Sequence, residues 1–187
     1  MTQFRNRLVR FVLSEPGTVM AEAVLVLPFM LWGYLGLFVY WDAFRSTNRI
    51  QKAAYTISDM ISREMVTIND AYITGMDSVM ERLIDGNQDV SIRVTSVTYS
   101  DTAKQFQVHW SRTTGGAALP ALTTTTLQAY KDNIPAMSDG DYVVIVETVV
   151  PYVPAFNVGI SPADIKQFIV TRPRFVPKIC LSGVTCS

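Results

Sequence analysis

The longest hydrophobic segment of the chain lies near its N-terminus, where residues 23–41 run for nineteen positions without a charged side chain. A helix of this length rises roughly 28 Å at about 1.5 Å per residue, close to the thickness of a bilayer's hydrocarbon core. One acid, Glu22, precedes the segment, and Asp42 ends it. The pattern predicts a single membrane-spanning helix.

Beyond Asp42 the helical pattern continues and becomes amphipathic, because positions on one stripe recur at alternating spacings of four and three residues. The stripe consists of Ala43, Thr47, Ile50, Ala54, Ile57 and Ile61, whereas Gln51, Lys52, Asp59 and Arg63 fall outside it. No Gly or Pro occurs between Gly36 and Gly75. A single helix of about 70 Å is therefore predicted over residues 18–65.

A second helix is predicted to follow directly. Thr67 is its expected N-cap, with Asp70 three residues later, and Gly86-Asn87 is its expected end. Its expected apolar face consists of Tyr72, Met76, Val79, Met80, Leu83 and Ile84.

From Val90 onward apolar positions alternate with a period of two, which predicts strands. Two alternating sets flank an expected hairpin loop at residues 100–104: Val90, Ile92 and Val94 before it, and Phe106, Val108 and Trp110 after it. Residues 113–126, rich in Gly and Thr, predict a surface loop, and a short helix is expected at residues 127–133.

The last third of the chain predicts two further strands. Residues 142–150 are apolar on both faces, which is typical of a central strand, and Pro151 and Pro154 are expected to end it. A final strand begins at residues 168–170, and two later prolines confine its continuation to an edge or an extended tail. The fold class is thus α+β: a long N-terminal transmembrane and amphipathic helix, then a small exported domain with an antiparallel sheet packed on helices.

Charge and composition narrow the function classes. The formal net charge is zero and no basic face is clustered, so we expect no nucleic-acid partner. The basic residues of the leader precede the hydrophobic segment, which favours a cytoplasmic N-terminus and an exported C-terminal part. Arg45 and Arg49, just after the segment, weaken that bias.

The two cysteines, Cys180 and Cys186, lie at the C-terminal end. In an exported protein they predict a disulfide that closes a small loop with Gly183 at its turn. The alternative is two free thiols in a reducing compartment. With His109 as the only histidine, they do not make up a four-ligand metal set. The alternation places His109 on the strand face opposite Trp110, as an exposed residue.

The N-terminal region allows three interpretations. An ordinary secretory signal peptide has a shorter apolar core, so removal after the segment is disfavoured. A plain uncleaved signal anchor fits the hydropathy. The third interpretation uses the order of parts: a basic leader, Gly17, then Glu22, then the hydrophobic helix, within the passage GTVMAEAVLVLPF.

That passage resembles the type IV prepilin signal, and in particular the TadE/TadF-like minor pilins (pseudopilins) of the Tad/Flp pilus. A second, weaker similarity is the Val-rich strand that runs into residues 149–156. The resemblance implies cleavage by a prepilin peptidase between Gly17 and Thr18, and a role for Glu22 in assembly by pairing with the new N-terminus of an adjacent subunit. The alternative for Glu22 is an acid that merely lies at the membrane interface.

The resemblance also implies the organisation of the chain. It divides the chain into a leader at residues 1–17, a transmembrane helix at 18–41, its amphipathic continuation at 42–65 and an exported domain at 66–187. The expected partners are the prepilin peptidase, other major and minor pilins, the pilus assembly platform and inner-membrane lipid.

Three functions are therefore compared. The leading one is a minor pilin or pilin-like protein for assembly of an adhesive Tad/Flp-type pilus. It would be held in the inner membrane as a single-pass protein with a periplasmic domain, and would initiate, cap or support the filament, either within the pilus or at its base. The alternative is an uncleaved single-pass protein whose exported domain binds a ligand or envelope partner. A membrane-tethered enzyme is least favoured, because the sequence carries no catalytic motif and predicts no cofactor.

Overall fold

The computed structural model describes residues 16–84, 89–114 and 119–186, with side chains described from residue 19 onward. Most of the predicted leader and the expected helix end at Gly86-Asn87 lie outside this part of the chain. The chain divides into two compact units. One contains Met1–Ala43 and Pro154–Ser161, and the other contains Phe44–Val153 and Pro162–Ser187.

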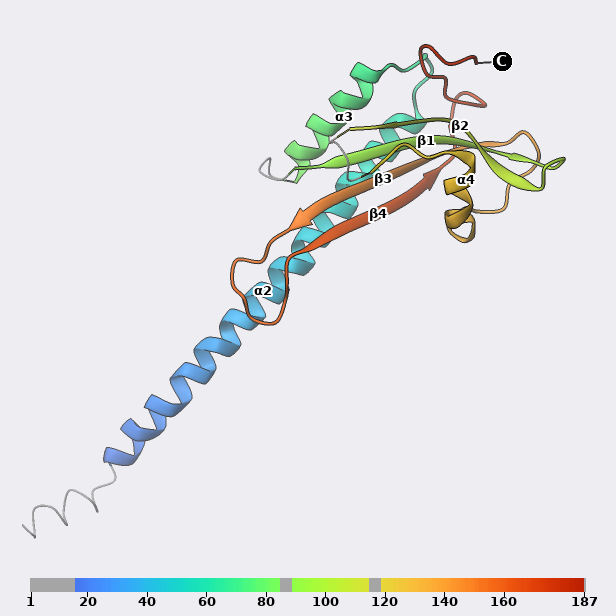
Figure 1. Ribbon diagram of the computed structural model, residues 1–187. Helices are drawn as coiled ribbons and strands as arrows, with labels where there is room; N and C mark the ends of the chain where they lie inside the picture. Colours follow the sequence, from blue (N-terminus) through green and yellow to red (C-terminus); the bar gives the residue numbers. More distant parts are fainter. Residues whose placement is uncertain (1–15, 85–88, 115–118, 187) are drawn as a thin grey trace, which may run out of the picture. The chain divides into compact units, whose positions relative to one another are not determined.

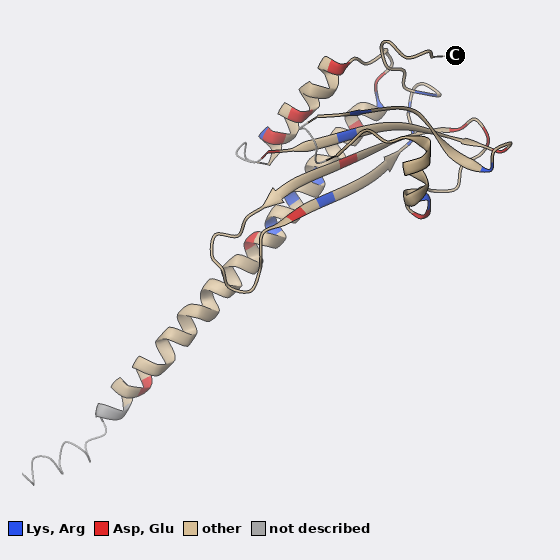
Figure 2. Ribbon diagram, viewed as in Figure 1, with Lys and Arg blue, Asp and Glu red and all other residues tan. Residues whose placement is uncertain are grey.

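The first helix, α2, spans Pro16–Ser62 as 47 uninterrupted residues, so the single long helix predicted from the sequence is confirmed. Pro28 lies inside it without ending it. Most large side chains in its first half are exposed, Phe29 by 76% and Leu37 by 73%, whereas Val39 at the end of this half is buried. Between residues 19 and 41 the sequence has one charged residue, Glu22, and Figure 2 shows this half of the helix almost entirely in the colour of uncharged residues. The helix is long and apolar enough to cross a membrane.

The second half of α2 forms part of the larger unit's core. Of the predicted stripe, Ile50, Ala54, Ile57 and Ile61 are buried, while Gln51 and Lys52 are exposed as expected. A 3.6-residue period places these apolar side chains on one face of the helix. That face packs against the sheet (Figure 1).

The sheet has four strands, all paired antiparallel, in the order β2-β1-β3-β4. The strands are β1 (Ser91–Ser100), β2 (Gln105–Thr113), β3 (Tyr142–Tyr152) and β4 (Ala163–Thr171). The hairpin between β1 and β2 and the central place of β3 confirm the sequence predictions. Because β2 and β3 both run antiparallel to β1, the chain must cross over between them, which requires a long connection.

Each face of the sheet carries its own apolar cluster. One face packs on α2 and on α3 (Asp70–Leu83), whose Ile73, Met76 and Met80 are buried. The other face is covered by the β2–β3 connection, which contains α4 (Thr124–Leu127) and the 3-10 helix η2 (Gln128–Asn133) (Figure 1). The larger unit is therefore three layers thick, with the sheet in the middle, and belongs to the α+β class.

Helix α3 begins later than the sequence predicted. Its N-cap is Asn69, whose side-chain oxygen accepts a hydrogen bond from the Tyr72 backbone N–H at 2.8 Å, so the assignment of Thr67 as the cap was wrong. An Asn side chain satisfies an unpaired donor of the first turn as well as Thr does. Of the predicted apolar face, Leu83 is 42% exposed and does not join the core.

A β-bulge changes the predicted faces of β2. The register of β1 against β2 shifts between Ser96 and Val97, so that Ser96 opposes Trp110, Val97 opposes Val108, and His109 is the extra residue. Phe106 and Val108 therefore contact one apolar cluster while Trp110 lies in the other, contrary to the simple alternation. A bulge inserts one residue and interrupts the two-residue period.

The bulge also corrects the placement of His109. Its Nε2 lies 3.1 Å from the Thr185 carbonyl oxygen, and the Trp110 indole N–H donates to the Ile179 carbonyl oxygen at 2.9 Å. Both side chains thus contact the C-terminal segment. His109 is half-buried rather than exposed on the opposite face.

Three further boundaries differ from the sequence prediction. Strand β4 begins at Ala163 rather than at Phe168. Strand β3 continues through Pro151 to Tyr152, because Pro151 is paired in register with Asp164 of β4. The Thr-rich stretch is not simply a loop: Thr123 caps α4 in a reciprocal capping box with Thr126. Such a box satisfies two backbone donors at once.

The C-terminal segment is held against the domain at several points. Cys180 and Cys186 form a disulfide with a Cα–Cα distance of 5.7 Å, as predicted, and Gly183 has a φ of 83° at the turn between them. The Ile68 backbone N–H donates to the Cys180 carbonyl oxygen at 3.0 Å, and the Ser182 N–H donates to the Ile68 carbonyl oxygen at 2.8 Å. The segment therefore joins the start of α3 to β2.

Replacing both cysteines with serine should lower the free energy of unfolding by about 2 kcal/mol, because the short loop no longer restricts the unfolded chain. Urea unfolding of the full chain in detergent micelles measures this, with Ser182→Ala as the control in the same loop. If both thiols of the native, unreduced protein react with a thiol label, the disulfide assignment is wrong.

Candidate functional site

The predicted processing and assembly residues lie at the start of α2. The backbones of Gly17 and Thr18 belong to its first turn, and Glu22 lies one turn further along, with its side chain exposed. The helix-dipole effect falls off beyond the first turn. Glu22 therefore lies beyond the turn in which the helix dipole acts most strongly.

The first half of α2 presents an apolar surface around its circumference. Large side chains that are more than 60% exposed occur on all its sides: Val19, Met20, Val24, Leu25, Leu27, Phe29, Met30, Leu31, Trp32, Tyr34 and Leu37. A helix that is hydrophobic all round belongs in lipid or among other helices. This segment is the first candidate functional element.

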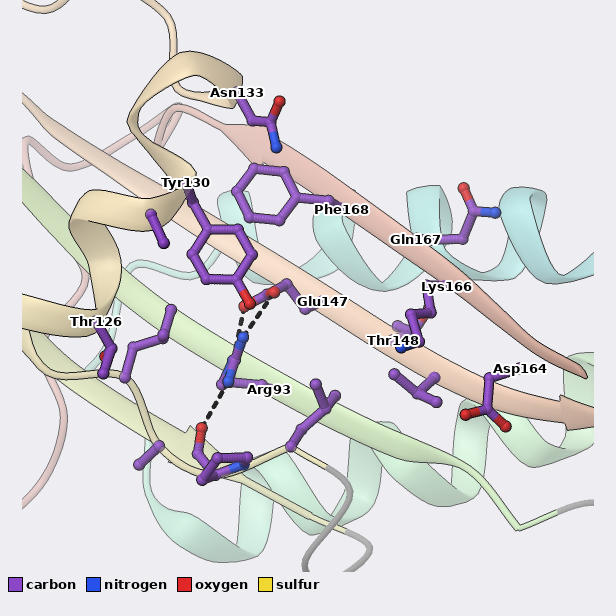
Figure 3. Close-up of a pocket in the computed structure, with 16 residues that line it drawn as sticks. Arg93, Thr126, Tyr130, Asn133, Glu147, Thr148, Asp164, Lys166, Gln167 and Phe168 are labelled. Atoms are coloured by element: carbon purple, nitrogen blue, oxygen red, sulfur yellow. Dashed lines mark hydrogen bonds and ion pairs between the residues drawn. The ribbon is translucent and has the colours of Figure 1, made fainter.

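The second candidate is a pocket of about 770 Å³ in the larger unit, on the sheet face covered by the β2–β3 connection. Strands β1, β3 and β4 provide its floor, and α4 and η2 provide one wall (Figure 3). Its volume lies within the usual range of small-molecule sites, about 300–1,000 Å³.

A buried ion pair forms the centre of the pocket floor. The Arg93 guanidinium on β1 donates from Nε to one Glu147 oxygen at 2.6 Å and from Nη2 to the other at 2.7 Å. The Arg93 Nη1 donates to the Pro120 carbonyl oxygen at 2.6 Å. Arg93 is 3% and Glu147 6% exposed. Two-point pairing of this kind is the strongest geometry for an arginine and a carboxylate.

Burial and pairing act in opposite directions on Arg93. Burial alone would lower the pKa of the guanidinium, but the hydrogen bonds and charge of Glu147, with a contribution from Tyr130, raise it above its ordinary value. The guanidinium therefore stays charged, and the pair balances its own charge inside the domain.

Aromatic side chains form the wall above the ion pair. The rings of Tyr130 on η2 and Phe168 on β4 stack with centroids 5.6 Å apart and planes 7° from parallel. Arg93 lies over the Tyr130 ring, its guanidinium carbon 5.9 Å from the centroid. Figure 3 shows the Tyr130 hydroxyl directed towards the ion pair.

Polar groups complete the rim. Asp164 and Lys166 on β4 are exposed, and Asn133 and Gln167 also line the pocket. The pocket therefore combines an apolar aromatic wall with both signs of charge and with amides. Such a lining suits a small polar molecule that carries an apolar part.

No group of three or more His, Cys, Asp and Glu side chains that could hold a metal ion occurs in the part of the chain that the structure describes. His109 lies beside Tyr142, with ring centroids 5.7 Å apart, and the two cysteines are bonded to each other.

Sequence reasoning missed the pocket, although part of its signal was present. Glu147 is a charge within residues 142–150, which otherwise read as buried on both faces, whereas Arg93 lies at a polar position of an alternating strand. Because a buried charge needs a partner, Glu147 signalled a partner that the sequence does not identify. The crossover that forms the other wall could not be predicted, because it brings residues 119–133 over strands that are distant in sequence.

Comparison with models of known protein families finds none that matches the chain, and comparison with curated proteins finds no significant match.

Glu147→Gln should lower the free energy of unfolding by about 3 kcal/mol, because it leaves the Arg93 charge buried without its partner. The double variant Arg93→Met, Glu147→Leu should lose less than the single variant, since neither charge then needs compensation. Urea unfolding in micelles measures both.

Asp101→Asn is the matched control for this series, because it breaks an exposed ion pair with Lys104 in the β1–β2 turn. Exposed pairs contribute less than about 1 kcal/mol. Equal losses for Asp101→Asn and Glu147→Gln would contradict the account of the buried pair.

Proposed function

We propose that this chain is a minor pilin, or pilin-like protein, for assembly of a Tad/Flp-type pilus. In this proposal a prepilin peptidase cuts between Gly17 and Thr18, α2 anchors the protein in the inner membrane with its N-terminus in the cytoplasm, and the larger unit is exported. The observation that carries the proposal is one helix that is apolar on all sides in its first half and core-forming in its second.

The exposed half of α2 suits both lipid and packing among other helices. Once a subunit leaves the bilayer, such a surface must be covered by helices of neighbouring subunits, because large apolar patches in water are unfavourable. Pilins and the assembly platform are the partners that this requirement fits.

In this proposal Glu22 sets the offset along the helix axis between neighbouring subunits. A carboxylate further into the bilayer costs about 2.5–3.5 kcal/mol, and an opposite charge offsets that cost. Cleavage after Gly17 would create an ammonium group at Thr18, four residues from Glu22. Pairing between Glu22 of one subunit and Thr18 of the next would fix their axial offset.

The larger unit distinguishes this chain from a filament subunit that consists of little more than the helix. Its sheet is covered on both faces, so it is a folded module whose edges, loops and pocket are available to other molecules. This suits a subunit that initiates, caps or supports a filament rather than one that forms the whole shaft.

A second candidate function is an uncleaved single-pass protein whose exported domain binds a ligand or an envelope partner. The pocket above the Arg93–Glu147 pair is the observation that favours it. Here α2 serves only as an anchor, so its sequence matters less than its length and hydrophobicity.

Glu22→Ala should leave membrane insertion unchanged and reduce pilus assembly, because it removes the charge proposed to pair between subunits. Glu22→Asp, which keeps the charge, should retain part of the assembly. Membrane fractionation and the yield of sheared filaments measure the two effects. Normal filament yield with Glu22→Ala would remove the basis for the pairing role.

Replacement of residues 1–41 by an unrelated single-span anchor separates the two candidate functions. The pilin proposal predicts loss of filament assembly although the domain is still exported. Unchanged filament assembly with the foreign anchor would contradict the pilin proposal and favour the binding protein instead.

A further inference from the structure

The loop between β3 and β4 contains an uncharged segment, Pro154–Ser161, that belongs to the same compact unit as the first half of α2. Its sequence, PAFNVGIS, is mostly apolar. Phe156 is 46% exposed and Ala155 is also exposed. The loop therefore presents part of an aromatic ring at its surface, next to apolar neighbours in the sequence.

The segment packs beside the end of the hydrophobic part of α2. The rings of Phe156 and Phe38 meet edge to face with centroids 6.2 Å apart. Gly159 has a φ of 100°, and a Cβ placed on it would lie 3.7 Å from the Tyr40 hydroxyl. The loop backbone thus passes close to Tyr40 in a conformation that favours glycine.

This contact lies where the helix changes from apolar to charged. Phe38, Tyr40 and Trp41 are the last aromatic residues before Asp42, and Tyr40 and Trp41 are 49% and 56% exposed. Tyr and Trp are enriched at the boundary between hydrocarbon and water. The loop therefore lies at the level on the helix where a membrane interface would be.

We propose that Pro154–Ser161 is a second membrane contact, lying in the headgroup region of the bilayer beside the end of the transmembrane helix. This rests on the membrane span of the proposed function. The partner is a lipid surface, because the loop continues the apolar surface of the span and carries no charge that would select a polar or charged partner.

Backbone chemistry limits how deep the loop lies. Within it, the Val158 N–H donates to the Phe156 carbonyl oxygen at 3.1 Å. An irregular loop cannot pair every peptide group internally, and unpaired groups are too costly in hydrocarbon. The headgroup region satisfies both the apolar side chains and the peptide groups, so Phe156 lies at the interface rather than in the bilayer centre.

The test places a fluorescent NBD label on the full chain in phosphatidylcholine vesicles, at Ala155→Cys in the loop. Ala103→Cys in the charged β1–β2 turn is the matched control, and Leu31→Cys in the middle of the hydrophobic segment is the reference for the span. The native cysteines are bonded to each other and do not take the label. Lipids that carry a nitroxide either near the headgroup or near the acyl-chain end serve as quenchers.

We expect the label at Ala155→Cys to lose emission with the shallow quencher more than with the deep one, Leu31→Cys to show the reverse, and Ala103→Cys to keep its emission. Absence of quenching at Ala155→Cys with normal quenching at Leu31→Cys overturns the loop contact alone. Absence at both positions also overturns the membrane span. The emission of the label at Ala155→Cys could also be unaffected by both quenchers and yet change with the protein-to-lipid ratio. That result overturns the lipid contact and indicates that the loop contacts a second copy of the chain.

Discussion

The fold of the larger unit depends on burial of one face of α2 against the sheet. Ile50, Ile57 and Ile61 are each at most 2% exposed and lie in the cluster that also contains Val94 and Trp110. Removing each such side chain from water contributes about 1.5–3 kcal/mol. Without this face the sheet would expose an apolar surface on one side, and α3 alone would not cover it. The helix that could cross a membrane is therefore also a structural part of the domain.

Sharing one helix between two environments constrains its sequence. The first half needs apolar side chains all round, whereas the second needs an apolar stripe and a polar remainder, and the change occurs at Asp42. The opposite face of the sheet is organised differently. There Arg93 and Glu147 balance each other in a buried site, so that side depends on paired charge as well as on apolar packing. Loss of either member would leave a charge in a place where water cannot compensate it.

The parts of this fold that follow from local pattern were predictable from the sequence. The long helix, its stripe, the β1–β2 hairpin, the central β3 and the disulfide each depend on residues close in sequence or on strong periodicity. The bulge at His109 was not predictable, because one extra residue moves Trp110 to the other face while the local alternation looks regular. The cap at Asn69 was missed because Thr67 and Asn69 carry the same chemistry two residues apart. The pocket depends on a crossover between distant segments, so only the buried charge of Glu147 could have been inferred.

We propose that α2 is a processed assembly helix rather than a plain anchor. Mass spectrometry of the mature protein's N-terminal residue, in membrane and sheared-filament fractions from cells that contain a prepilin peptidase, tests this most directly. If a prepilin peptidase processes the helix, the mature chain begins at Thr18 in both fractions. A chain that retains Met1 or the leader in the membrane, with none in the filaments, would contradict it and leave a membrane-anchored binding protein as the better explanation.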